Sequence, residues 1–432
     1  MKKAWKKARW ILIPAVLAAG IWTWIVKFES QKPEIRLADD AAFLGRELSF
    51  RATDRKSGLA GIRVEAVQAG RTVEIFAEKL PEPLPSVVKT LSLRPLPAGL
   101  ADGEILLRIS AEDRSWNGGN TQILEKKMII DTRPPRMSLL GGPYAISLGG
   151  AGAAAWSVEE DVALVGIQVG DRFFRGFPDG EKRYLVYYAL PYDASRGVPI
   201  FGVAEDAAGN RANVVFRPSI KTAAFKKDPV VLSDRFLSGV AAYFKNLDSG
   251  LQGTDLDVFL TVNRAQRDLD YERLDLLCRD TAARPLWSGP FLRLPKSKSM
   301  ASFGESRTYL YNGKIVDSQA HLGVDLASTV QCPVPAANSG RVVLAGPLGI
   351  HGQTIVLDHG LGLFSMYCHL SRIDVAVPKD VARGEILGLS GSTGLAGGDH
   401  LHFAVLVQGV FVNPVEWWDA HWIRDNILRE GR

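Results

Sequence analysis

Residues 397–406, GGDHLHFAVL, place His400 and His402 two positions apart in an otherwise apolar run. Because side chains alternate between the two faces of a strand, both imidazoles lie on one face, whereas Leu401 and Phe403 lie on the other. A half-buried strand turns its apolar face to the core and its polar face away from it. The pattern therefore predicts a core strand whose second face carries histidines for a chemical purpose.

The histidines of the chain are concentrated near its C-terminus. All seven lie at or beyond position 321, and the 320 residues before it contain none. The motif HLGVD sets His321 and Asp325 four residues apart, and Gly323 lets the chain turn between them. The motif MYCHL adds His369. This distribution favours a metal or catalytic site in the last domain over scattered core histidines.

The side chains in these three motifs are of the types that a catalytic zinc site uses. Two imidazoles and one carboxylate form a common zinc ligand set that leaves the fourth tetrahedral position open. Two further imidazoles beside such a site can accept a proton from water or stabilise an oxyanion. Each motif alone is weak, because an isolated H-x-H pair is more often structural. The three motifs together, within about 80 residues, are specific.

Five other aromatic side chains lie near these motifs in the sequence. Tyr309 and Tyr311 are two positions apart in a predicted strand and share a face, so one of them could contact the substrate or an oxyanion; otherwise both are wall residues. His359, in LDHG, is interpreted as a hydrogen-bonded structural residue. His351, in a loop flanked by glycine, is placed along a substrate groove, and His421, among tryptophans, is assigned to packing.

Several consecutive segments resemble the lysostaphin/LytM-type zinc metallopeptidase domain. They are HLGVDLA (321–327), QTIVLDHGLGLFSMYCHLS (353–371), KDVARGEILGLSGSTGLAGGDHLHFAV (379–405) and NPVEWW (413–418). The resemblance extends upstream to ASFGESRTYLYNGK (301–314), a lead-in common in Gram-negative members, and covers about a third of the chain. The glycine framework and five chemical positions occur in register, which makes the resemblance specific.

The resemblance implies a role for each of the five positions. His321, Asp325 and His402 would be the ligands of one Zn²⁺ per chain, and His400 and His369 would be the catalytic pair beside it. Members that have lost catalysis usually lack one or more of these residues, and this chain keeps all five. The resemblance therefore implies an active hydrolase.

The N-terminus concentrates positive charge before an apolar run. The formal net charge is +5, and five lysines and arginines fall within the first nine residues, so the rest of the chain is nearly neutral and nucleic-acid binding loses its main support. Residues 10–26 carry no charge, and Trp22 and Trp24 lie near their end. These features predict an uncleaved transmembrane signal anchor, with a cleaved signal peptide as the alternative. Either leader places the bulk of the chain outside the cytoplasm.

Residues 35–217 consist of short predicted strands with an internal repeat. GLAGIRV (58–64) recurs as ALVGIQV (163–169), and AEDRSWNGGN (111–120) recurs as AEDAAGN (204–210). In both copies an Asp-to-Asn turn, where Gly and Asn tolerate positive φ, joins two strands. The pattern resembles tandem bacterial immunoglobulin-like modules. A single irregular β domain remains the alternative.

The expected fold is mainly β, with five segments. Residues 1–30 form a cytoplasmic stub and transmembrane helix, 31–133 and 134–220 form two immunoglobulin-like β-sandwich modules, 221–285 form a helical connector, and 286–432 form a β-rich peptidase domain of antiparallel sheets with a C-terminal helix. The connector is expected because 233–246 begins with a serine N-cap and carries an apolar stripe at helical spacing. The run 254–280 fits one or two further helices.

These features predict a single-pass, membrane-anchored zinc endopeptidase that acts in the periplasm. Its expected substrate is the peptide crosslink of peptidoglycan, and the resemblance to Gram-negative members favours the D-alanyl to diaminopimelate bond. Its expected partners are peptidoglycan peptide stems, the membrane through the N-terminal helix, and a possible protein bound by the immunoglobulin-like modules, with no nucleic acid. Two alternatives are a non-catalytic scaffold that activates cell-wall amidases and a protease that acts on a protein substrate.

Overall fold

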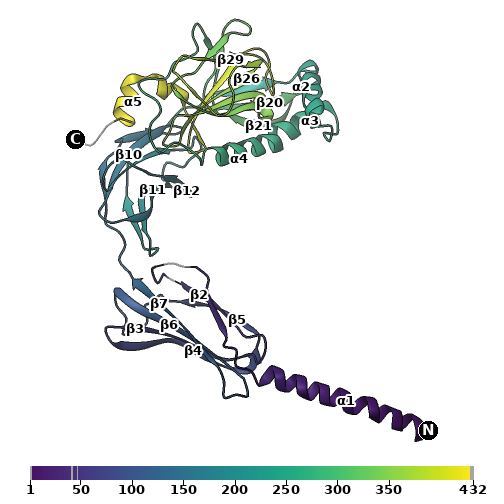
Figure 1. Cartoon of the computed structure of the whole chain (residues 1–432). Coiled ribbons are helices and arrows are strands. Elements are labelled where there is room, and N and C mark those ends of the chain that lie inside the picture. The colour runs from purple at the N-terminus through teal and green to yellow at the C-terminus, as the bar shows by residue number, and fades with distance from the viewer. Residues whose placement is uncertain (1, 40–41, 46, 429–432) are drawn as a thin grey trace. The chain divides into compact units, whose positions relative to one another are not determined.

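The computed structural model describes residues 2–39, 42–45 and 47–428 (Figure 1). The chain divides into two compact units, which we describe separately. The first contains Met1–Pro134 and Glu205–Arg211, and the second contains Pro135–Ala204 and Ala212–Arg432. The protein is mainly β, as the sequence predicts.

The first unit begins with helix α1, Lys2–Lys27. Within the described residues, no helix combines the length and the apolar character that a membrane span requires. The transmembrane anchor therefore remains a prediction.

Two antiparallel sheets follow α1 in the first unit. The first sheet has the order β1 (Glu34–Leu37), β2 (Glu47–Thr53), β5 (Ser86–Ser92), and the second has the order β4 (Arg71–Leu84), β3 (Leu59–Gln68), β6 (Gly103–Asp113), β7 (Thr121–Ile130). Alternate residues of these strands are buried, and Phe50, Ile62 and Leu107 belong to one core. The unit is thus built around two sheets, and its immunoglobulin-like character remains a prediction.

The repeated Asp-to-Asn motif corresponds to a repeated turn. Asn120 donates its backbone N–H to Oδ1 of Asp113 over 2.7 Å and its side-chain amide to Oδ2 over 2.9 Å. Asn210 makes the same two bonds to Asp206, at 2.8 and 2.9 Å. A bidentate bond of this kind closes the turn between two strands, which explains why the two short motifs recur in the sequence.

The second unit also begins with two sheets. One has the order β13 (Phe177–Pro178), β14 (Arg183–Ala189), β10 (Ala151–Val158), β8 (Met137–Gly141). The other has the order β12 (Arg172–Arg175), β11 (Val162–Val169), β15 (Ile200–Asp206), β16 (Arg211–Val215), and β9 (Ala145–Ser147) pairs with β17 (Ser219–Lys221). We call residues 135–204 and 212–221 the second module. Its strand order repeats that of the first unit, with its core side chains Trp156 and Phe174 fully buried.

The connector starts with strand β18 (Lys227–Val231) and continues with four helical segments. They are α2 (Asp234–Leu247), α3 (Asp255–Thr261), the π-helical segment η1 (Val262–Gln266) and α4 (Arg267–Leu277). Ser233 caps α2 and Thr254 forms a capping box with Asp257, so polar side chains set both helix starts. The helices lie beside β20 (Glu305–Tyr311) and β21 (Lys314–His321), with which β18 forms a three-stranded sheet (Figure 1).

A large antiparallel sheet forms the centre of the last part of the chain. Its order is β19 (Lys298–Ala301), β22 (Val324–Ala327), β30 (Leu401–Val407), β26 (Leu363–Leu370), β25 (Gln353–Asp358), β24 (Gly340–Pro347), β28 (Lys379–Val381), and β31 (Val410–Val412) pairs with β30. A small sheet of β23 (Pro333–Pro335), β29 (Ile386–Leu389) and β27 (Arg372–Ile373) accompanies it. The turns η2 (Gly349–His351) and η3 (Pro414–Trp418) and helix α5 (Ala420–Asn426) complete this part.

The strand β30 is the one that the motif GGDHLHFAVL predicts. It lies between β22 and β26, where Asp325 and Cys368 are both paired with His402. Leu401 and Phe403 are buried on the core side, as predicted. All three cysteines of the chain, Cys368 among them, are free and buried. The central position of β30 holds its histidines beside groups from both neighbouring strands.

Candidate metal centre and active site

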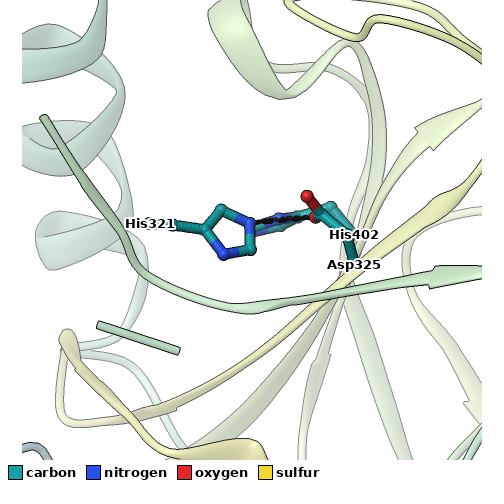
Figure 2. Close-up of side chains that lie close together, drawn as sticks. All are labelled: His321, Asp325 and His402. Carbon is teal, nitrogen blue, oxygen red and sulfur yellow. Dashed lines mark hydrogen bonds and ion pairs between the residues drawn. The ribbon is translucent and has the colours of Figure 1, made fainter. Parts of the chain in front are cut away.

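Three side chains from three strands converge on one point (Figure 2). His321 ends β21, Asp325 lies in β22, and His402 lies in β30. His321 Nε2 lies 2.9 Å from Asp325 Oδ1 and 3.0 Å from His402 Nδ1. His402 Nδ1 lies 2.8 Å from the same carboxylate oxygen. All three side chains are buried, and they are the set that the sequence predicts as metal ligands.

The geometry of this cluster fits a zinc ion. Three ligand atoms of a tetrahedral zinc site, each about 2.0–2.1 Å from the metal, lie about 3.3 Å from one another. The observed separations of 2.8 to 3.0 Å are close to that value. His321 Nδ1 donates to the carbonyl oxygen of Ser302 over 2.9 Å, which leaves Nε2 unprotonated and aimed at the ligand cluster. The residues present thus suit zinc in type, separation and tautomer.

Gly323 makes room for one of these imidazoles. A Cβ atom at this position would lie 2.5 Å from Cε1 and Nε2 of His402. Real Cβ atoms do not approach other atoms so closely, so the ring can occupy its place only beside glycine. The sequence suggests a turn as the reason for Gly323, and the structure adds this close approach.

The carboxylate of Asp325 is held by a guanidinium as well as by the histidines. Arg307, in β20, donates from Nη2 to Asp325 Oδ2 over 2.9 Å, which leaves Oδ1 for the ligand cluster. Burial would raise the pKa of Asp325, but the charge of His321 and the hydrogen bonds from His321, His400 and His402 outweigh it. Together they hold the pKa of Asp325 well below its usual range. Asp325 is therefore an anion, as a metal ligand must be.

The predicted catalytic pair lies beside the ligand cluster. The rings of His369 and His400 are 4.9 Å apart, and His400 Nε2 lies 3.5 Å from Asp325 Oδ1. His400 Nδ1 donates to the carbonyl of Gly398 and His369 Nδ1 donates to that of Thr393, each over 2.8 Å. Because a carbonyl oxygen can only accept, both rings carry a proton on Nδ1, and in the neutral tautomer Nε2 is the nitrogen that can take a proton.

The backbone at His369 departs from strand geometry. Its φ is +61°, in the left-handed region that few residues other than glycine adopt. This conformation occurs where β26 ends, and it brings the ring of His369 to 5.8 Å from that of His402. Burial, followed by the charges of His400 and His402, lowers the pKa of His369 to about 3. The ring is thus neutral.

A cavity of about 430 Å³ opens beside the ligand cluster. Its wall includes all five predicted site histidines and acids, and it also includes side chains of the connector and of β20. The connector contributes Phe236, Phe259, Arg267 and Tyr271, and β20 contributes Arg307 and Tyr309. Arg307 was not predicted as a site residue, although its spacing of two residues from Tyr309 gives it the same face of the strand.

The remaining predicted residues have mixed outcomes. Tyr309 is buried and lines the cavity, whereas Tyr311 lies outside the cavity lining and donates from Oη to Asp234 over 2.8 Å. Both tyrosines pack against one hydrophobic cluster, so they share a face as predicted, and Tyr309 is the one that reaches the cavity. His359 bonds to Ser339 and Ser365 and is structural, as predicted. His421 was predicted to pack among tryptophans, which is wrong, because its side chain is 78% exposed.

The match to known proteins falls on the part of the chain that carries the site. Residues 319–414 match peptidase family M23. This C-terminal region is therefore an M23 domain of the LytM/lysostaphin type. Membership in this family supports the assignment of the region as a metallo-endopeptidase of peptidoglycan.

Individual relatives match a limited part of the chain. The chain is 37% identical over 95 residues to the DD-carboxypeptidase/endopeptidase Mpg of Neisseria meningitidis serogroup B and 38% identical over 96 residues to the peptidoglycan DD-endopeptidase ShyA of Vibrio cholerae. Each alignment covers 22% of this chain and 22% of the relative, so the chain spans about a fifth of these relatives. The catalytic domain of lysostaphin from Staphylococcus simulans is 33% identical, with a TM-score of 0.24 over 28% of this chain and 90% of that domain.

Proposed function

We propose that the protein is a zinc-dependent endopeptidase that hydrolyses the peptide crosslinks of peptidoglycan. The observation that carries the proposal is the convergence of His321, Asp325 and His402 on one point, with two imidazoles beside them whose Nε2 atoms are free. The match to peptidase family M23 covers the part of the chain in which these residues lie, and two relatives are named as endopeptidases.

In this proposal each group of site residues has a separate role in the reaction. Zinc held by the triad would supply a Lewis acid for the scissile carbonyl and would lower the pKa of a water molecule. Nε2 of His400 is placed to take the proton of the attacking water, and its Nδ1 bond to Gly398 fixes the ring orientation. His369, neutral and fixed by Thr393, would accept a hydrogen bond from the same water through its Nε2 and so share in its activation.

The bond that we propose is D-alanyl to diaminopimelate. Support comes from the two relatives, whose names specify DD-endopeptidase activity, and from the lead-in at 301–314. We further propose that the protein acts outside the cytoplasm, because its substrate lies there. In this proposal the β-sandwich modules serve as a spacer or a docking arm that holds the catalytic unit at the cell wall.

Intact sacculi provide the test. The zinc-loaded full chain is incubated with them, with and without chelator, and released muropeptides are identified by chromatography and mass spectrometry. We expect crosslinked dimers to become monomers, and chelator to stop the reaction. His421→Ala is a matched control, because it removes an exposed imidazole far along the sequence from the ligands.

Two outcomes would contradict the proposal. Zinc-bound protein that leaves the dimers intact would support the non-catalytic scaffold, and adding a cell-wall amidase to the same assay would reveal activation. Cleavage of protein but not of muropeptides would support the protease alternative.

A further inference from the structure

The connector provides one wall of the catalytic cavity and places a cation there. Arg267 and Tyr271, at the start of α4, line the cavity together with the ligand cluster. Tyr271 lies beside His351, with ring centroids 6.3 Å apart, and His351 lies beside His402, with centroids 6.0 Å apart. A chain of neighbouring side chains therefore leads from the metal ligands to Arg267.

The guanidinium of Arg267 is held in place by neutral hydrogen-bond acceptors, and Asp270 is an acid that interacts with it electrostatically. Nε and Nη2 donate to Asn263, to its carbonyl oxygen over 3.0 Å and its side-chain oxygen over 2.6 Å, and Nη1 lies 3.3 Å from Tyr271 Oη. All three acceptors are neutral, and within the described part of the chain Arg267 forms no ion pair. Arg264, one turn earlier, is paired with Asp317.

The charge of the cavity wall also favours an anion. Its charged groups are the guanidiniums of Arg267 and Arg307 and the carboxylates of Asp228 and Asp325. These four charges cancel, so a zinc ion with neutral imidazoles would leave the cavity with a net charge of about +2. Because Arg307 is already paired with Asp325, Arg267 is the cation that remains available.

His351 adds an unpaired polar atom to the same wall. Only 5% of this residue is exposed, and its Nε2 has no hydrogen-bond partner among the described residues. The connector fixes the turn that carries it, because Asp270 in α4 accepts the backbone N–H of Ile350 over 2.7 Å. A buried polar atom without a partner is costly, so a ligand group that bonds to it would be stabilised.

We propose that Arg267 and His351 form a subsite for a carboxylate of the peptide substrate, close to the scissile bond. The inference rests on the proposed function and deepens it. In a DD-crosslink, the residue that supplies the leaving amine keeps a free α-carboxylate beside the bond. A planar guanidinium binds such a group through two parallel hydrogen bonds. A crosslink made of neutral glycine residues offers no such group, so the subsite would select DD-peptides.

The test compares two substrates with one change between them. A crosslinked muropeptide dimer with free diaminopimelate carboxylates is assayed beside the same dimer amidated at those carboxylates, with the zinc-loaded full chain. Because a hydrogen bond between charged groups is strong, we expect wild type to cleave the free dimer roughly 10- to 100-fold more efficiently, mainly through KM. Arg267→Gln should lose most of this preference, with the loss in cleavage efficiency larger for the free dimer than for the amidated dimer.

Matched variants separate recognition from charge and folding. Arg273→Gln removes the same charge from an exposed position of α4 outside the cavity, and it should keep the preference. Arg267→Lys keeps the charge but loses the planar group that makes two parallel hydrogen bonds. It should therefore retain part of the preference for the free dimer. His351→Phe keeps an aromatic ring and loses the nitrogens, and it should lower the cleavage of the free dimer more than that of the amidated dimer. Zinc content and thermal melting of each variant must match wild type.

Two results would overturn the subsite. One is equal cleavage of the free and amidated dimers by wild type, and the other is an unchanged preference in folded Arg267→Gln. If wild type cleaves neither dimer, the proposed function fails, and calorimetric titration with the free and amidated monomer peptides still decides the subsite. Tighter binding of the free peptide would support it, and equal binding would refute it.

Discussion

Glu416 provides a quantitative test of how the second module is joined to the peptidase domain. It lies in the turn η3, and its Oε2 accepts the backbone N–H of Ala151, in β10, over 3.3 Å. Its carboxylate also lies against Gly150, where a Cβ atom would be 2.9 Å from Oε1. Burial raises the pKa of Glu416 from an ordinary 4.5 to about 8, and the bond from Ala151 offsets only part of this. The carboxyl is thus mainly protonated at neutral pH.

The raised pKa makes folding dependent on pH. The folded state favours the protonated form, so the stability contribution is complete below pH 4.5 and is lost as pH rises through about 8. Each unit of difference between the two pKa values corresponds to about 1.4 kcal/mol. The stability lost, relative to low pH, is therefore about 5 kcal/mol above pH 8 and about 3 kcal/mol at pH 7. Glu416→Gln keeps a neutral acceptor for Ala151. We therefore expect the variant to match wild type near pH 4.5 and to be more stable at pH 8.

Urea denaturation followed by tryptophan fluorescence measures the effect, because Trp417 is buried next to Glu416. The quantity of interest is the difference in free energy of unfolding between variant and wild type at pH 5 and at pH 8, both without metal, so that other titrating groups cancel. Glu272→Gln, at an exposed position of α4, is the control and should show no such difference. If the stability of Glu416→Gln relative to wild type were the same at both pH values, the argument from burial would be refuted.

The remaining predictions concern the metal centre. His402→Ala should lose both zinc and activity, whereas His400→Ala should keep most of its zinc and lose about 100-fold or more in kcat. Metal analysis and kinetics measure these effects. Equal loss of zinc in the two variants would contradict the division of roles. Gly323→Ala should weaken zinc binding about tenfold or more, because its methyl group displaces the ring of His402. Arg307→Gln should lower zinc affinity by roughly 10- to 100-fold through Asp325, and competition with a chelating dye measures it.

The ligand cluster could be predicted because its determinants are local. Alternation along β30 places His400 and His402 on one face, and the glycine in HLGVD lets His321 approach Asp325. Pairing of β22 with β30 then brings the carboxylate opposite His402. Each step depends on residues that are neighbours in sequence or in adjacent strands.

Other parts of the site depend on features that a residue pattern does not contain. The position of His369 requires a positive φ, which histidine adopts only under the constraint of its surroundings. Tyr311 lies outside the cavity lining because its hydroxyl bonds to Asp234 at the start of α2. Arg267 and Tyr271 reach the cavity through the packing of a connector whose own pattern indicates only helices. Tertiary contacts decide all of these positions.

The packing of the second module shows that the catalytic part of the chain is larger than its sequence motifs. Gln408, at the turn after β30, accepts the backbone N–H of Arg175 and donates to the carbonyl of Tyr187, over 2.8 and 3.1 Å. Arg172 donates to the carbonyl of Gln408 and pairs with Asp275 in α4. A fragment that begins after this module would leave these groups and the apolar surface beneath them exposed to water, at a cost in stability. The second module is therefore a structural support of the strand that carries the catalytic histidines.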